Sequence, residues 1–215
     1  KKITPASLRM SSEQRLKEGD AVRYEIETKN NAWLLFFTNK AQVYKARVGD
    51  FADTKASVMG EYLPAKLGME EGETPIYVTV TEDYRGWMLF FFQSGKAAKV
   101  PLCAYETKQN RKKLVGAYSD KAELAALREL TEETELAVQT TNGRLLLVHT
   151  TQIPEKATRN TIGVAVISLK KGARIESVKA AADLELANPH RYRVRNLPAA
   201  GALLRAEDVA EQITL

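Results

Sequence analysis

The sequence repeats about every 50 residues, and this period restricts the possible folds more than any other property of the chain. Asp20, Glu73 and Glu123 hold the same acidic position in three copies and stand 53 and 50 residues apart. Each copy contains an acidic turn, a first periodic stretch, a short polar gap and a second apolar run. The copies begin at residues 19, 72 and 122, and a fourth begins at Gly172. We therefore expect an array built from one repeated supersecondary unit.

Within a copy, the hydrophobic pattern has the period of β-strands. Apolar and polar residues alternate at 22–26 and at 76–80, as in a strand with one buried face. The aromatic-aliphatic runs 33–37 and 87–91 are too short for a helix and fit strands that are buried on both faces. Turn-forming residues follow these runs, most clearly Asn142-Gly143, and predict hairpins. The returning strands are expected at 41–48, 97–104 and 145–151.

Residues 119–133 conflict with this pattern when they are read alone. The segment SDKAELAALRELTEE has an N-cap residue and high helix propensity throughout. The repeat alignment, however, puts residues 123–130 at a strand position. Propensity is the weaker guide because tertiary context overrides it, so we predict a strand.

Antiparallel units of three or four strands at this spacing are typical of a propeller. We therefore predict an all-β chain with about four four-stranded blades, whether closed, open or truncated. The repeat units cover residues 1–48, 49–104, 105–151 and 152–215 of a single domain. A β-sandwich is the structural alternative, although it does not require matched periods in three copies.

Composition limits the chemistry that the chain can perform. Cys103 is the only cysteine, which excludes an internal disulfide and a multi-thiolate zinc site. It lies in a predicted strand and is expected to be a buried, inert thiol. No carboxylate pair, metal-ligand cluster or nucleophile-base arrangement is found, so we expect neither catalysis nor a cofactor. No apolar run approaches the ~20 residues of a membrane span, and no membrane partner is expected.

The net charge of +5 conceals an uneven distribution. Residues 85–119 hold seven Lys/Arg against one Glu, and residues 136–180 hold seven against two. Residues 31–84 and 120–135 are acidic, with net charges of −3 and −4. Lys and Arg side chains on adjacent loops could neutralise the phosphates of a DNA backbone and release counterions. The alternative is that these charges only keep a β-rich surface soluble and guard strand edges.

The densest basic cluster would be the centre of such a DNA-binding surface, and other cations would extend it. No group of side chains suited to reading base edges is visible, so binding would be largely independent of DNA sequence. The predicted DNA-binding residues are Arg111, Lys112 and Lys113, extended by Lys96, Lys99, Arg144, Lys156, Arg159, Lys170, Lys171 and Arg174.

The repeat body resembles the C-terminal domain of the A subunits of bacterial DNA gyrase and topoisomerase IV. The likeness is carried by LLFFTNKAQVYKARV at 34–48, LFFFQSGKAAKVPL at 89–102 and AVQTTNGRLLLVHT at 137–150. The opening segment KKITPASL at 1–8 is similar to the outer strand that ends a preceding repeat of the family. The resemblance covers residues 1 to about 180.

The resemblance implies a β-pinwheel, a propeller variant in which blades exchange outer strands, with a basic rim that bends or wraps duplex DNA. Its partners would be duplex DNA, the ATPase subunit of the enzyme and the rest of the A subunit, in the cytoplasm and nucleoid of a bacterium. Catalysis would lie elsewhere, and the parent protein would be an ATP-dependent type II topoisomerase, an isomerase.

One feature separates the chain from the gyrase pattern. No intact glutamine-arginine-glycine-rich box is present in the corresponding loops 54–60, 109–116 and 158–163, and only the second loop begins with Gln and is strongly basic. The resemblance therefore favours a topoisomerase IV-like role over gyrase-type wrapping. The acidic segments also leave open a different function, that of a protein-interaction propeller.

Overall fold

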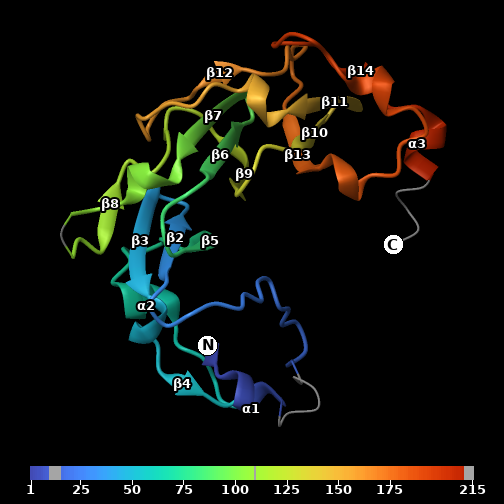
Figure 1. Cartoon of the computed structure of the whole chain (residues 1–215). Helices are drawn as coiled ribbons and strands as arrows, with labels where there is room; N and C mark the ends of the chain where they lie inside the picture. Colours follow the sequence, from blue (N-terminus) through green and yellow to red (C-terminus); the bar gives the residue numbers. More distant parts are fainter. Residues whose placement is uncertain (10–15, 109, 211–215) are drawn as a thin grey trace. The chain divides into compact units, whose positions relative to one another are not determined.

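The computed structural model describes residues 1–9, 16–108 and 110–210, and Figure 1 shows its helices and strands. The chain forms two compact units. The first unit consists of Lys1–Tyr84 and Thr107–Ala117, and the second of Arg85–Glu106 and Tyr118–Leu215. The chain therefore enters the second unit, returns to the first for eleven residues and enters the second again. None of the helices described is long and apolar enough to cross a membrane.

The first unit contains a four-stranded antiparallel sheet in the order β5-β2-β3-β8. Strands β2 (Trp33–Thr38) and β3 (Gln42–Arg47) form its central hairpin. They are flanked by β5 (Pro75–Thr81) and by the short β8 (Lys113–Val115).

The second unit contains two further four-stranded sheets, in the orders β12-β7-β6-β9 and β13-β10-β11-β14. Their central hairpins are β6–β7 and β10–β11, and every neighbouring pair of strands is antiparallel. The strands are β6 (Trp87–Phe92), β7 (Lys96–Pro101), β9 (Leu124–Leu130), β10 (Glu135–Thr140), β11 (Arg144–His149), β12 (Val164–Ala165), β13 (Ile175–Ala180) and β14 (Ala202–Leu203).

The remaining elements are short. A two-stranded parallel sheet joins β1 (Lys2–Ile3) to β4 (Asp53–Thr54). The helices are α1 (Pro5–Arg9), α2 (Leu63–Leu67) and α3 (Ala206–Ala210). The described residues also contain five 3₁₀ helices, at Val48–Asp50, Leu102–Tyr105, Thr150–Gln152, Ala181–Asp183 and Pro189–Tyr192.

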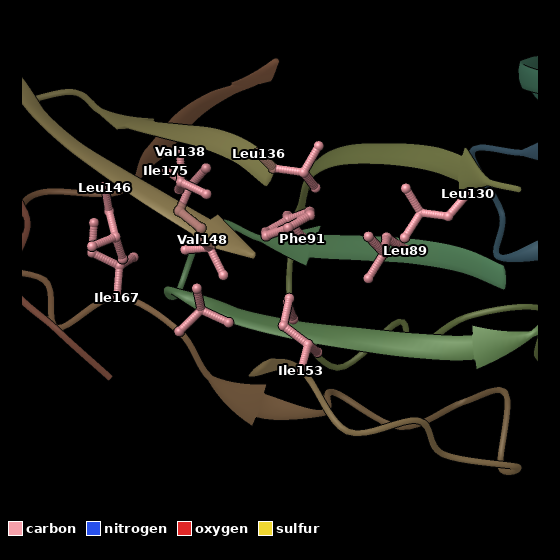
Figure 2. Close-up of a cluster of buried hydrophobic side chains, with 12 residues drawn as sticks. Leu89, Phe91, Leu130, Leu136, Val138, Leu146, Val148, Ile153, Ile167 and Ile175 are labelled. Atoms are coloured by element: carbon pink, nitrogen blue, oxygen red, sulfur yellow. The ribbon is translucent and has the colours of Figure 1, made fainter. Parts of the chain in front are cut away.

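The apolar runs of the sequence form the centre of each sheet because side chains on both of their faces are buried. In β6, Met88 to Phe92 are all fully buried. Phe91 lies between Leu136 of β10 and Val148 of β11, and Leu89 lies beside Leu130 of β9, so one hydrophobic cluster joins the two sheets of the second unit (Figure 2). In the first unit, a separate cluster forms around Phe36, Tyr44 and Phe51.

Each complete sheet takes its outer strand from a later repeat. β8 follows β7 in the chain but pairs with β3, and β12 follows β11 but pairs with β7. The prediction of an all-β propeller built from four-stranded antiparallel units is confirmed. Three of the roughly four expected blades are complete in the described residues.

Two local predictions are wrong. Residues 20–28 form no strand, although their alternating pattern predicts one. Cys103 lies in a 3₁₀ helix with an exposed side chain, and not in a buried strand, because β7 ends at Pro101. In the opening segment, only Lys2–Ile3 is a strand, and helix α1 follows it.

Candidate nucleic-acid interface

Three loops of the second unit meet at the hairpin-turn end of its sheets. They are the β6–β7 turn, the β10–β11 turn and the loop that leads into β13. The amide of Ile175 donates to the carbonyl of Gln93 at 3.3 Å, and the amide of Thr141 donates to the carbonyl of Arg174 at 3.0 Å. The loops are therefore held together by backbone hydrogen bonds.

Five of the predicted DNA-binding residues lie on these joined loops, and we refer to them as the turn cluster. Lys96 and Arg144 open the second strand of each hairpin, immediately after the turn, and are half-buried. Lys170, Lys171 and Arg174 lie in the loop before β13, and all three are exposed.

The charges of the turn cluster are largely available to a ligand. The Arg144 guanidinium donates to the carbonyl of Gly201 at 2.8 Å, which fixes the side chain without neutralising it. Within the part of the chain that the structure describes, Lys96, Lys170, Lys171 and Arg174 take part in no ion pair. A polyanion could therefore approach these groups without displacing a carboxylate from them.

The corresponding end of the first unit is acidic. The turn before β5 carries Glu70, Glu71 and Glu73, where the turn before β13 carries the basic residues. The buried carboxylate of Glu73 accepts hydrogen bonds from the Thr38 hydroxyl at 2.6 Å and the Tyr44 hydroxyl at 2.7 Å. Burial tends to raise the pKa of Glu73, but these bonds and one from the backbone amide of Glu70 outweigh it and hold the pKa below its ordinary value.

The cluster Arg111, Lys112 and Lys113 belongs to the first unit and is only partly free. Arg111 and Lys112 are exposed. The Lys113 ammonium lies 2.8 Å from a carboxylate oxygen of Glu70, which raises the pKa of Lys113. Gln109, which begins this loop, is outside the described residues. The structure places these three residues in a different unit from the turn cluster.

Lys99 must be removed from the predicted surface, because it is a core residue that is 4% exposed. Its ammonium lies 4.6 Å from the centre of the Trp87 ring, pairs with Glu133 and donates to the carbonyl of Thr150. Lys45 has the equivalent place in the first unit, with its ammonium 4.8 Å from the Trp33 ring. These lysines stabilise their sheets by cation–π contacts and do not reach the surface.

Lys156 and Arg159 lie apart from the turn cluster. The amide of Lys156 donates to the carbonyl of Lys99, and the Arg159 guanidinium donates to the carbonyl of Ala104 at 3.0 Å. These contacts place them beside the far end of β7, away from the turn that begins at Gln93. Lys156 is exposed and Arg159 is half-buried.

One further cation near the joined loops is missing from the predicted set. Lys121 precedes β9, and the carbonyl of Glu123, two residues later, accepts a hydrogen bond from the amide of Gln93. The signal was present in the repeat, since Lys121 aligns with Lys171 when residues 122 and 172 are matched. Its acidic neighbours Asp120 and Glu123 reduce the local positive potential.

Comparison with known proteins gives consistent results. The family "DNA gyrase C-terminal domain, beta-propeller" matches residues 32–58 and 134–182. The A subunit of the DNA gyrase of Streptomyces coelicolor is 30% identical over 95 residues, which are 43% of this chain and 11% of that protein. The chain thus matches only about a tenth of the length of that gyrase protein.

Solved structures extend the likeness to nearly the whole fold. The C-terminal domain of DNA topoisomerase IV superimposes with a TM-score of 0.75 at 19% identity, over 96% of this chain and 70% of that one. The E. coli ParC C-terminal domain gives 0.67 at 15% identity, over 89% and 84%. A DNA gyrase A C-terminal domain gives 0.58 at 14% identity, over 81% and 60%. The predicted resemblance is therefore confirmed: the chain is similar to the C-terminal domains of type IIA topoisomerase A subunits.

Proposed function

We propose that this chain is a DNA-binding C-terminal domain of a type IIA topoisomerase A subunit, which positions or bends duplex DNA for strand passage. The observation that carries the proposal is the turn cluster, in which backbone hydrogen bonds join loops that carry Lys96, Arg144, Lys170, Lys171 and Arg174. None of these five cations has a carboxylate partner within the described residues.

The chemistry of the turn cluster favours contact with phosphates over contact with bases. Long cationic side chains on exposed turns can follow a curved backbone, and each neutralised phosphate releases counterions. The cluster holds no Asn or Gln arranged in pairs for base edges, so it supports affinity without sequence preference.

The wider biological setting is part of the same proposal. The parent protein would be an ATP-dependent type II topoisomerase in the bacterial cytoplasm, with catalysis outside these residues and ATP hydrolysis in a partner subunit. The lack of an intact glutamine-arginine-glycine-rich box favours a topoisomerase IV-like role over gyrase-type wrapping. Arg111, Lys112, Lys156 and Arg159 remain proposed secondary contacts.

The proposal is tested by titrating duplex DNA against the chain and a triple variant at several salt concentrations. Lys170→Glu, Lys171→Glu and Arg174→Glu together should weaken binding at least about tenfold for all sequences alike and make it less dependent on salt. The matched control reverses Lys179, Arg191 and Arg195, which are exposed cations of the same unit. Equal losses of DNA affinity in both variants would show that only the net charge of the chain matters. Unchanged affinity in the first variant would show that the turn cluster does not bind DNA.

A protein-interaction scaffold is the second candidate. Nine of the ten exposed large hydrophobic side chains of the described residues lie in the first unit. A chain that fails to bind duplex DNA at 50 mM salt, but retains a protein partner after nuclease treatment, would support this function over DNA binding.

A further inference from the structure

Residues 20–28 have the sequence of a flanking strand, but no strand among the described residues pairs with them. In each complete sheet, the corresponding segment pairs with the first strand of a hairpin, as β5 with β2, β9 with β6 and β13 with β10. Residues 20–28 have no regular secondary structure, and Val22, Tyr24 and Ile26 are 55%, 47% and 45% exposed. The Tyr24 ring meets the ring of Tyr77 edge-on, and this contact leaves the three side chains about half exposed.

The turn that leads into residues 20–28 has the same geometry as the turns that lead into β5 and β13. Gly19, Gly72 and Gly172 have φ values of 87°, 72° and 81°. The amide after each glycine donates to the carbonyl three residues before it, at 3.0, 3.0 and 2.9 Å. The chain is therefore folded locally as it is at the start of a flanking strand.

A second segment of the same unit has the sequence of an outer strand. The loops 54–60 and 109–116 both end in Gly, and Leu114 and Val115 in the second loop form part of β8. Val58 and Met59 have the same place before Gly60. Leu114 is 4% exposed, whereas Val58 and Met59 are 47% and 83% exposed and lie in no strand.

The pairing observed near this segment differs from that of the complete sheets. β4, just before it, pairs in parallel with β1, and the Lys1 ammonium donates to the carbonyl of Val58 at 3.0 Å. The outer strands β8, β12 and β14 all pair antiparallel with the second strand of a hairpin. Apolar side chains are also exposed along the whole stretch: seven of the ten exposed large hydrophobics described lie within residues 16–62.

We propose that residues 20–28 and 57–59 are the two flanking strands of a further blade and bind a β-hairpin of the same repeat type as β6–β7. The first strand of this hairpin is aromatic and aliphatic and pairs antiparallel with residues 20–28. Its second strand pairs antiparallel with residues 57–59. The hairpins β2–β3, β6–β7 and β10–β11 cannot fill this place unless they leave their own sheets. Each of them already pairs with a further strand on both sides. This surface is a protein-binding site and is separate from the proposed DNA-binding function.

The proposal is tested by fusing a second copy of residues 85–111 directly before Lys1. This segment contains the β6–β7 hairpin, and in its own place it is followed by Lys112-Lys113-Leu114, which Lys1-Lys2-Ile3 resembles, so the fusion places the hairpin before Lys1 as it stands before Lys112. Amide hydrogen exchange at residues 20–28 and 57–59 should slow at least tenfold relative to the unfused chain. Exchange in the original β6 should stay unchanged.

Matched variants separate blade completion from a general effect of the fusion. Leu89→Asp with Phe91→Asp in the added copy alone should abolish the slowing, as should Val22→Asp with Ile26→Asp. Arg23→Gln with Glu25→Gln, on the polar positions of the same segment, should retain it. Exchange that stays fast in the intact fusion, or slows equally with the Asp-bearing copy, would overturn the proposal.

Discussion

At the scale of single residues, Lys99 shows why side-chain burial could not be predicted from residue type. Its strand follows an unusually apolar partner, WMLFFF, and the lysine is buried with its ammonium over Trp87. The repeat contains a signal for this burial, because Lys45 and Lys99 occupy the same position in two copies. Lys45 pairs with Leu35 and Lys99 pairs with Leu89, and each lysine contacts a Trp of the strand with which it pairs. A cation repeated at a core position of a sheet indicates a structural role.

The same residue gives a stability prediction. Lys99→Leu should lower the free energy of unfolding by about 2 kcal/mol, because Glu133 is left partly buried without its ammonium partner. Adding Glu133→Gln should restore at least half of the lost stability. In the third sheet, the position equivalent to Lys99 is already a leucine, Leu147. Urea unfolding measures both variants. A double variant that is less stable than Lys99→Leu would contradict the pairing, and a loss of DNA affinity in it would return Lys99 to the binding surface.

Glu73 gives a prediction of pH dependence. Its pKa is lower in the folded chain than in the unfolded chain, so its contribution to stability is complete above the ordinary carboxyl pKa of about 4.3 and is lost as the pH falls toward the lowered value. Glu73→Gln should cost about 1 to 2 kcal/mol at pH 7 and flatten the fall of stability between about pH 5 and 3. Urea unfolding across this range is the measurement, and an unchanged slope would show that Glu73 is not a source of the acid sensitivity.

At the scale of elements, the sequence predicts the strands that carry their own pattern and misses those that do not. The repeat phase predicts β9 against its helix propensity, and the pairing of β9 with β6 outweighs that propensity. β8, β12 and β14 have only two or three residues, too few to show a period of two, and their partners are distant in sequence. The strand expected at 22–26 pairs with no strand among the described residues.

The docking of an outer strand can be tested at Gly163, which precedes β12. A Cβ at Gly163 would lie 1.8 Å from the carbonyl oxygen of Ala97 in β7, and its φ is 72°. Gly163→Ala should therefore displace β12 and cost about 2 kcal/mol or more. Gly172→Ala is the matched control, since its φ is 81° but nothing lies within 4 Å, and it should cost only about 1 kcal/mol. Urea unfolding and exchange at Val164 and Ala165 compare them, and equal costs would show that the close approach to β7 is unimportant.

At the scale of the whole molecule, strand exchange makes the first compact unit discontinuous in sequence. No single boundary separates the two units, because β8 returns from beyond the β6–β7 hairpin of the second unit to cover β3 of the first. Leu114 and Ala117 in this returning segment are 4% and 0% exposed. The repeat alignment could place the units along the sequence, but it could not show which hairpin each outer strand joins, since all the hairpins present similar edges.

This discontinuity predicts the behaviour of shortened chains. A chain that ends at Ala117 retains β8, whereas one that ends at Glu106 loses it together with the buried side chain of Leu114. Burial of one Leu contributes about 2 kcal/mol, so the longer chain should unfold at a clearly higher urea concentration, although the eleven added residues lie far from β3 in sequence. Leu114→Asp in the longer chain should lower its midpoint to that of the shorter one, while the exposed Val115→Asp should not. Equal midpoints for the two unmodified chains would mean that the returning strand does not stabilise the first unit.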